Sequence, residues 1–129
     1  MRFSSGMHRE KRSGLWQDNH MDVVLTGTGS PLPDPNRAGP STLIKADDCH
    51  VLVDAGRGVV MRMAGAGSLP VFLRAVLITH LHSDHICDLN DVITTHWIMS
   101  QGNVALPIYG PPGTKEFVNR QIHALEADI

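Results

Sequence analysis

The stretch "RAVLITHLHSDHICD", residues 74–88, decides how this chain folds and where its chemistry lies. It opens with a short apolar run bounded by polar residues, a pattern typical of a fully buried strand. Polar ligand types follow at once, within six positions: His80, His82, Asp84 and His85. Open α/β sheets place their sites beyond the carboxyl ends of their strands. The sequence therefore predicts a functional site directly after this strand.

The quartet His80, His82, Asp84 and His85 has the chemistry of a metal site, because zinc takes nitrogen from imidazole and oxygen from carboxylate. Alternate side chains of an extended turn share a side, so His80 and His82 could bind one cation together. Asp84 and His85 begin the next helix and could face a second cation roughly 3.5–4 Å away. Such an ion pair activates a bridging water and clamps a phosphoryl or acyl group.

The alternative is that these residues are polar members of a surface turn, or histidines satisfied within the core. That interpretation suits the isolated histidines better than the quartet, because ligand types rarely crowd so closely by chance. We therefore predict that the isolated histidines are surface or satisfied core residues and not metal ligands: His8, His20, His50, His96 and His123.

Upstream of the quartet the sequence predicts three consecutive antiparallel strands. They begin at Asp22, at residue 41 in "STLIKA", and at residue 50 in "HVLVDAG", with a turn at 47–48. Between the first two strands, "PLPDPNRAGP" holds four prolines and a glycine in ten residues. This segment cannot be a helix or a central strand and predicts a long loop, ordered or mobile.

Helical spacing appears in three places. The expected inner faces are Val59, Val60, Met63 and Ala64 in the first helix, Ile86, Leu89, Ile93 and Trp97 after the quartet, and Phe117, Ile122, Leu125 and Ile129 in the last. "LPIYG", residues 106–110, predicts one more strand. The order β-β-β-α-β-α-β-α indicates an α/β (α+β) fold, a mixed sheet with helices packed on one face.

Length and composition fit one globular domain: 129 residues, 42% hydrophobic, with a formal net charge of −2 that gives no basic field for nucleic acid. Arg2, Arg9, Lys11 and Arg12 crowd the opening. We interpret residues 1–20 as a loose basic N-terminal extension and residues 21–129 as the domain. The opening has no apolar run of a secretory signal and no segment could span a bilayer, so we expect no membrane association.

Two cysteines, Cys49 and Cys87, do not support a disulfide framework. A reducing, cytoplasmic location is therefore expected. Cys87 lies two residues beyond the quartet, and we interpret it as a small buried residue rather than a metal ligand.

The quartet matches, residue for residue, the His-x-His-x-Asp-His signature of the metallo-β-lactamase superfamily, and the sequence resembles that superfamily. Three further segments are similar to its ribonuclease Z-like branch: "LTGTGSPLPDPNRAGPSTLI" to the first hairpin, "VLVDAGRG" to a strand ending in Asp-x-Gly with Asp54 as its acid, and "LPIYGPPGT" to the strand and turn after the metal-binding helix. These motifs run from about Met21 to Thr114.

The resemblance implies a zinc-dependent hydrolase of the αββα sandwich class with two zinc ions in the complete domain. His80 and His82 would bind the first ion, and Asp84 and His85 the second. Asp84 is also the candidate catalytic general base, and Asp54 would hold the ligand loop through hydrogen bonds without binding metal. Iron and manganese also suit mixed His/Asp ligation. Transfer RNA, cleaved at its 3′ trailer, is the namesake substrate of this branch, and a homodimer is one oligomeric state that its members adopt.

The match is partial. The superfamily completes its site with two further histidines and a bridging aspartate, and the sequence has no family-like context for them after the quartet. We therefore expect the chain to be the N-terminal half of the sandwich, truncated at its C-terminus, with one sheet face left unburied. Each zinc would have two protein ligands here, whereas catalytic zinc takes three plus water. The isolated chain is expected to be inactive.

Two alternatives stay open at this point. One is a small-molecule metallohydrolase: a cyclic nucleotide phosphodiesterase, an arylsulfatase-like enzyme or a lactonase. The scarcity of aromatic residues for stacking bases, 5% of the chain, favours it over an RNA substrate. The other is a non-catalytic metal-binding remnant.

Overall fold

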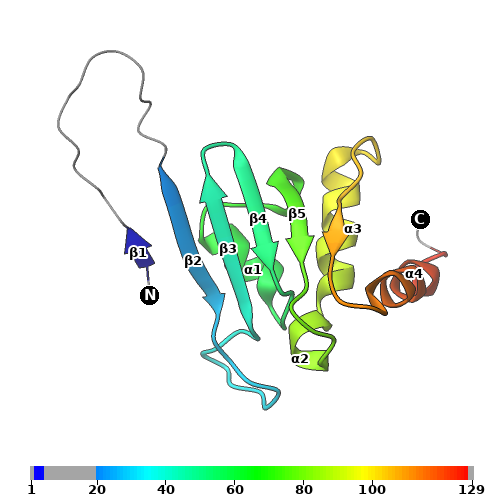
Figure 1. The fold of residues 1–129 in the computed structure, drawn as a ribbon, viewed down its shortest axis with the longest axis horizontal. Helices are drawn as coiled ribbons and strands as arrows, with labels where there is room; N and C mark the ends of the chain where they lie inside the picture. The colour runs from blue at the N-terminus through cyan, green and yellow to red at the C-terminus, as the bar shows by residue number, and fades with distance from the viewer. Residues whose placement is uncertain (1, 5–19, 128–129) are drawn as a thin grey trace.

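The fold is built on one mixed, six-stranded sheet, seen in a computed structural model that describes residues 2–4 and 20–127 (Figure 1). The strands lie in sequence order: β1 (Arg2–Ser4), β2 (Met21–Gly27), β3 (Ser41–Ala46), β4 (Cys49–Val53), β5 (Leu73–Leu77) and β6 (Ile108–Tyr109). Neighbours from β1 to β4 are antiparallel, and β4, β5 and β6 are parallel. The predicted α/β class is confirmed.

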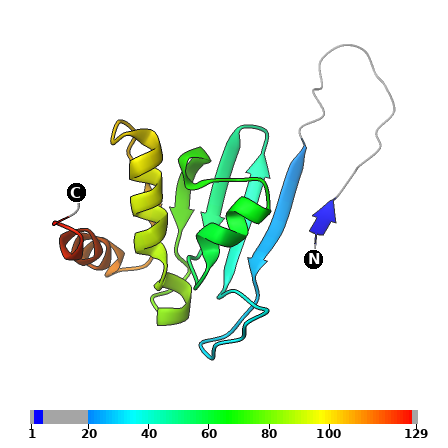
Figure 2. The ribbon, with the colours of Figure 1, turned by 180° about the vertical axis from the view of Figure 1, so that it is seen from behind.

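The helices follow the predicted order, with two short additions. They are α1 (Val59–Gly65), a 3₁₀ turn η1 (Pro70–Phe72), α2 (Ser83–Ile86), α3 (Leu89–Ser100) and α4 (Thr114–Ala124). Parallel strands need a crossover connection, which α1 and η1 provide between β4 and β5. Helices α1 and α3 lie on the same face of the sheet (Figure 2). No helix in the described ranges is both long and apolar enough to cross a membrane.

The core lies between that sheet face and the two helices. Register places Leu43, Leu52 and Val76 in one row across β3, β4 and β5, so their side chains share a face. All three are fully buried. They form one apolar cluster with buried residues of the helices: Val59 and Met63 of α1, Leu89 and Val92 of α3. This burial fixes the ends of β4 and β5, which carry the site.

The opposite face of the sheet is apolar but open. The neighbouring row runs through Leu25, Thr42, Val53, Leu77 and Tyr109. Leu25 is 41% exposed, Leu77 38% and Tyr109 61%. No helix of the described part of the chain covers this face (Figures 1 and 2). The unburied sheet face expected from the sequence is therefore present.

The predicted inner face of the helix after the quartet is confirmed for Ile86, Leu89 and Ile93 but is wrong for Trp97. Ile86 and Leu89 are buried, but Trp97 is 42% exposed, while Val92 and His96 are buried instead. Within α3 the buried positions are Leu89, Val92 and His96, at i, i+3 and i+7. Repeated steps of four residues, from Leu89 through Ile93 to Trp97, drift away from this face because a helix turns once every 3.6 residues.

Smaller differences occur in α1 and α4. Ala64, expected on the inner face of α1, is exposed. In α4, Phe117 packs against the core cluster, whereas Ile122 is 41% exposed and Ile129 lies outside the described residues. The last helix therefore covers less of the core than its apolar spacing indicates.

The predicted loose extension, residues 1–20, falls mostly on residues that the structure does not describe and stays a prediction. Its described part includes β1, which pairs with β2 through Arg2 and Val24. A three-residue strand is too short to show the alternation by which strands are recognised in a sequence.

Candidate metal centre

The quartet begins three residues beyond β5, at the carboxyl end of the parallel strands, as predicted. Backbone bonds fix this edge: the amide of Asp54 donates to the carbonyl of Leu77 over 2.8 Å, and the amide of Ile78 donates to the carbonyl of Tyr109 over 2.7 Å. The loop from Thr79 to His82 therefore leaves the sheet beside the end of β4.

The turn after β4 clamps α2 through Ala55. The amide of Ala55 donates to the carbonyl of His85 over 2.7 Å, and its carbonyl accepts from the amide of Asp88 over 3.0 Å. Two bonds on one residue tie the ligand helix to the end of a core strand. The end of this short helix is consequently held by a residue distant in sequence.

Gly56 shows why the Asp-x-Gly motif ends in glycine. A Cβ at this position would lie 2.4 Å from the backbone carbon of Gly39 and 2.7 Å from the carbonyl oxygen of Asp84. Backbone atoms cannot yield as a flexible side chain does. Only glycine lets the turn after β4, the proline-rich loop and the ligand helix approach this closely.

Asp54 is the polar centre of the loop. It is 6% exposed and adopts a left-handed backbone with φ 61°. Its Oδ1 accepts a hydrogen bond from the amide of Thr79 over 2.8 Å, and its Oδ2 accepts from the Thr79 hydroxyl over 2.8 Å. Its Oδ2 also lies 2.7 Å from Nδ1 of His85. A carboxylate this well buried needs such donors.

The imidazole rings of His82 and His85 both lie close to that of His80. The ring centroid of His80 lies 4.6 Å from that of His82 and 4.0 Å from that of His85. Nδ1 of His80 contacts the Thr79 hydroxyl over 2.9 Å. Because Nδ1 of His80 and of His85 are engaged, Nε2 is the free donor atom of both rings. The Asp84 carboxylate lies 3.7 Å from Nε2 of His85.

These atoms fit zinc in kind but form an incomplete set. Free imidazole Nε2 atoms backed by hydrogen bonds at Nδ1, with a carboxylate beside them, are the donors that zinc prefers. Among the described residues, however, no group of three His, Cys, Asp or Glu side chains is arranged to hold one metal ion. The quartet thus supplies part of a centre.

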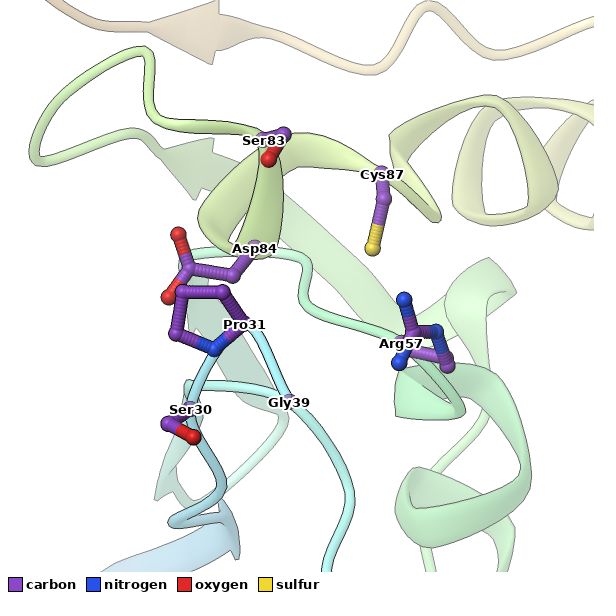
Figure 3. Close-up of a pocket in the computed structure, with 7 residues that line it drawn as sticks. All are labelled: Ser30, Pro31, Gly39, Arg57, Ser83, Asp84 and Cys87. Carbon is purple, nitrogen blue, oxygen red and sulfur yellow. The ribbon is translucent and has the colours of Figure 1, made fainter. Parts of the chain in front are cut away.

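A small pocket of about 80 Å³ opens beside Asp84 (Figure 3). Its lining comes from three elements that the turn after β4 brings together: Ser30, Pro31, Gly39, Arg57, Ser83, Asp84 and Cys87. The Cys87 thiol points toward the Arg57 guanidinium, whereas the Asp84 carboxylate points toward Pro31 (Figure 3). No salt bridge of Arg57 is found among the described residues.

Cys87 was predicted to be buried and is exposed. It lies in the break between α2 and α3 and lines the pocket, which the sequence pattern could not show. Partial burial and the neighbouring Asp88 carboxylate raise the pKa of the thiol, and Arg57 opposes that rise.

Thr79, Asp88 and Arg57 are contributors that the sequence did not reveal. The carboxylate of Asp88, directly before α3, accepts a hydrogen bond from the amide of Gly58 at the start of α1. That contact joins residues 30 positions apart. Of these three residues, only Thr79 has a signal in the sequence, because it lies directly before the first histidine of the quartet.

Four of the five isolated histidines lie in the described residues. His50 contacts the Ser68 hydroxyl over 2.7 Å, and burial and Lys45 lower its pKa. His96 is buried, which lowers its pKa, but its Nε2 has no hydrogen-bond partner among the described residues, so it is not the satisfied core histidine that the sequence predicted. His123 pairs with Glu126 at 3.2 Å, and His20 lies 3.7 Å from Asp22. His8 lies outside the described residues.

Comparison with known proteins agrees with this geometry. The chain matches the sequence profile of the Metallo-beta-lactamase superfamily over residues 34–124. The chain belongs to this superfamily. The matched range includes Asp54 and the whole quartet, so the signature residues lie within the shared domain.

Similar proteins include those named Ribonuclease Z, which confirms the resemblance to that branch. Identity is 55% over 111 residues to the protein of Mycolicibacterium paratuberculosis and 53% to that of Mycobacterium avium. Each alignment covers 84% of this chain and 40% of the relative. The chain therefore spans less than half of the curated relatives it matches.

Solved structures also match most of this chain but less than half of their own length. The short form of human tRNase Z is 28% identical with a TM-score of 0.73, over 81% of this chain and 39% of that one. The metallo-beta-lactamase fold protein YhfI from Bacillus subtilis is 30% identical with a TM-score of 0.66, over 78% and 40%. Both likenesses agree with a partial domain of this fold.

Proposed function

We propose that this chain supplies part of the active site of a zinc-dependent phosphodiesterase of the ribonuclease Z type, which processes the 3′ end of transfer RNA. The observation that carries the proposal is the Asp54 network, because it leaves Nε2 of His80 and of His85 free beside the Asp84 carboxylate. The names of the relatives support the substrate class.

In this proposal His80 and His82 hold a first zinc ion, and Asp84 and His85 hold a second. Bound zinc would supply Lewis acidity and lower the pKa of a water molecule. Asp84 would accept the proton of that water as general base. Asp54 would orient His85 and the loop without touching metal. Iron or manganese in place of zinc is compatible with these donors, and the remaining ligands would come from outside the described quartet.

Arg57 gives the proposal a place for the substrate's charge. Its guanidinium lines the pocket beside Asp84, together with the hydroxyls of Ser30 and Ser83. Arginine binds phosphate through paired N–H donors. A pocket of about 80 Å³ suits one small anionic group rather than a whole base. We therefore assign Arg57 to contact a phosphate of the substrate.

The first test is the metal content of the purified 129-residue protein by elemental analysis after dialysis. We expect little retained zinc and no turnover, because catalytic zinc takes three protein ligands and the quartet provides two for each ion. About two zinc ions per chain, or zinc-dependent turnover by the pure protein, would contradict the incomplete-centre interpretation.

The substrate is tested in a chimera that joins this chain to the part of the Mycolicibacterium paratuberculosis relative that it does not match. We expect the folded chimera to bind zinc and to cleave precursor transfer RNA, and H82A and D84N variants to lose that cleavage. A zinc-loaded chimera that hydrolyses only a simple diester would favour the small-molecule alternative. A chimera that binds zinc without hydrolysing either would favour the non-catalytic remnant.

We further propose a cytoplasmic location, supported by Cys49 and Cys87, which are both free and exposed thiols. A homodimer of the complete protein also stays a prediction. Its test is the sedimentation velocity of the zinc-loaded chimera.

A further inference from the structure

The Thr79 hydroxyl joins the Asp54 carboxylate to the first histidine of the quartet. Its Oγ1 lies 2.8 Å from Oδ2 and 3.0 Å from Oδ1 of Asp54, and 2.9 Å from Nδ1 of His80. Asp54 thus reaches two rings by different routes: directly to His85 and through Thr79 to His80.

The direction of these hydrogen bonds follows from the number of protons. A threonine hydroxyl has one proton, and an ionised carboxylate can only accept. The hydroxyl must therefore donate to Asp54, because its lone pairs would otherwise face the carboxylate oxygens. In its contact with His80, the hydroxyl oxygen must then accept a hydrogen bond from Nδ1–H of the imidazole. A neutral imidazole with its proton on Nδ1 has a free lone pair on Nε2.

We propose that Thr79 is a positioning residue that holds His80 in the Nδ1–H tautomer and so presents Nε2 to the metal. The presentation of Nε2 to a metal rests on the proposed function, whereas the tautomer of His80 is a property of the metal-free chain. Asp54 sets the same tautomer at His85 without an intermediary. One buried carboxylate thereby orients a ligand of each of the two proposed ions.

The hydroxyl contacts only Asp54 and His80 among the described residues. The amide of Thr79 also donates to Oδ1 of Asp54, over 2.8 Å, so one hydrogen bond between the loop and Asp54 remains when the hydroxyl is removed. The residue is exposed and lies outside the core cluster. Replacing Thr79 with valine keeps the shape and the amide and removes only the hydroxyl, so the orienting role can be separated from the fold.

The test is nitrogen NMR of the histidine rings in the metal-free 129-residue protein at about pH 8, where free histidine is neutral. The nitrogen without a proton resonates far downfield of the one that carries it. In wild type we expect His80 and His85, assigned by H80Q and H85Q, to carry their protons on Nδ1. In T79V, His80 should lose that preference while His85 keeps it, and T79S should restore it.

T95V is the matched control, because the Thr95 hydroxyl also donates to a carboxylate, that of Asp91, over 3.2 Å on an exposed part of α3. It should leave both rings unchanged. A His80 that keeps Nδ1–H in T79V overturns the proposal, as does a wild-type His80 with its proton on Nε2. If T79V fails to fold, T79A provides the same comparison with T79S.

A zinc titration of the same variants separates the two proposals. In the chimera described above, T79V should weaken zinc binding about 10- to 100-fold, the usual effect of losing a ligand's supporting hydrogen bond. An unchanged affinity would overturn the metal-presenting role of Thr79 and leave the zinc centre standing. If no variant of the chimera binds zinc although the tautomers behave as expected, the tautomer assignment stands and the proposed metal centre fails.

Discussion

The carboxylate of Asp54 lies 2.7 Å from Nδ1 of His85, although the two residues are 31 positions apart in the chain. This contact closes a loop between the end of β4 and the start of α2, and Thr79 adds a second closure from the end of β5. The orientation of the candidate ligands therefore depends on a residue that binds no metal in our proposal.

Replacing Asp54 tests that dependence. D54N keeps the shape of the side chain, and asparagine also tolerates a positive φ. The variant therefore removes only a hydrogen-bond acceptor for Thr79 or His85. We expect the free energy of unfolding to fall by about 1–3 kcal/mol, because buried donors lose their acceptor. D54A should cost about 1–2 kcal/mol more, because alanine resists the left-handed backbone. Urea denaturation measures both.

Asp47 is the matched control for these variants. It also has a positive φ, 50°, but lies exposed in the turn between β3 and β4. D47N should be nearly neutral, and D47A should show the backbone cost alone. Equal losses in D54N and D47N would mean that the Asp54 hydrogen bonds contribute nothing to stability.

Gly56 offers a prediction about close packing. In G56A the new methyl would meet backbone atoms of Gly39, Pro40 and Asp84 at 2.4–2.7 Å. We expect a loss of about 3 kcal/mol, at the upper end for overpacking, together with a displaced ligand helix. Chemical-shift changes in the amides of residues 83–86 would report that displacement.

Gly65 is the control, because a Cβ there would have no neighbour within 4 Å. Since Gly65 is the last residue of α1, G65A should leave stability unchanged or raise it by up to about 1 kcal/mol. If G56A were as harmless as G65A, the turn after β4 would be looser than the structure indicates.

The sequence predicted what depends on local pattern. The buried strand before His80 and the antiparallel strands upstream were recognised because alternation and apolar runs are properties of neighbours in the chain. The quartet was recognised for the same reason, since its four ligand types lie within six positions. Family resemblance added the fold around them and a role for Asp54.

The sequence could not predict contacts made by tertiary packing. The hydrogen bond from Gly58 to Asp88 and the contact of Arg57 with the pocket both depend on how the turn after β4 meets α2. The exposed Trp97 reflects how α3 is rotated against the sheet, because the buried positions of this helix are Leu89, Val92 and His96. Such features need the three-dimensional arrangement.

Replacing a leucine should destabilise the protein much more on the covered face of the sheet than on the open face. Leu52 is fully buried beneath the helices, whereas Leu77, its neighbour one residue out of phase on β5, is 38% exposed on the open face. L52A should cost about 2–5 kcal/mol of unfolding free energy. L77T should cost less than about 1 kcal/mol and reduce self-association of the isolated chain, which sedimentation velocity measures. Similar losses in both variants would mean that the second face is covered in solution.

His96 predicts how stability depends on pH. Its side chain is 2% exposed, and burial lowers its pKa below the ordinary value of 6.5. The unfolded chain therefore takes up a proton near pH 6.5 that the folded chain does not accept until lower pH, so stability is greatest above 6.5 and falls as the pH drops below it. H96L should reduce this loss between about pH 7.5 and 5.5, measured by urea denaturation with a chelator present. Part of the slope should remain, because the pKa of His50 is also lowered, and H50Q should remove that part. If H96L and wild type lose the same stability over this range, His96 is not the residue that opposes folding in acid.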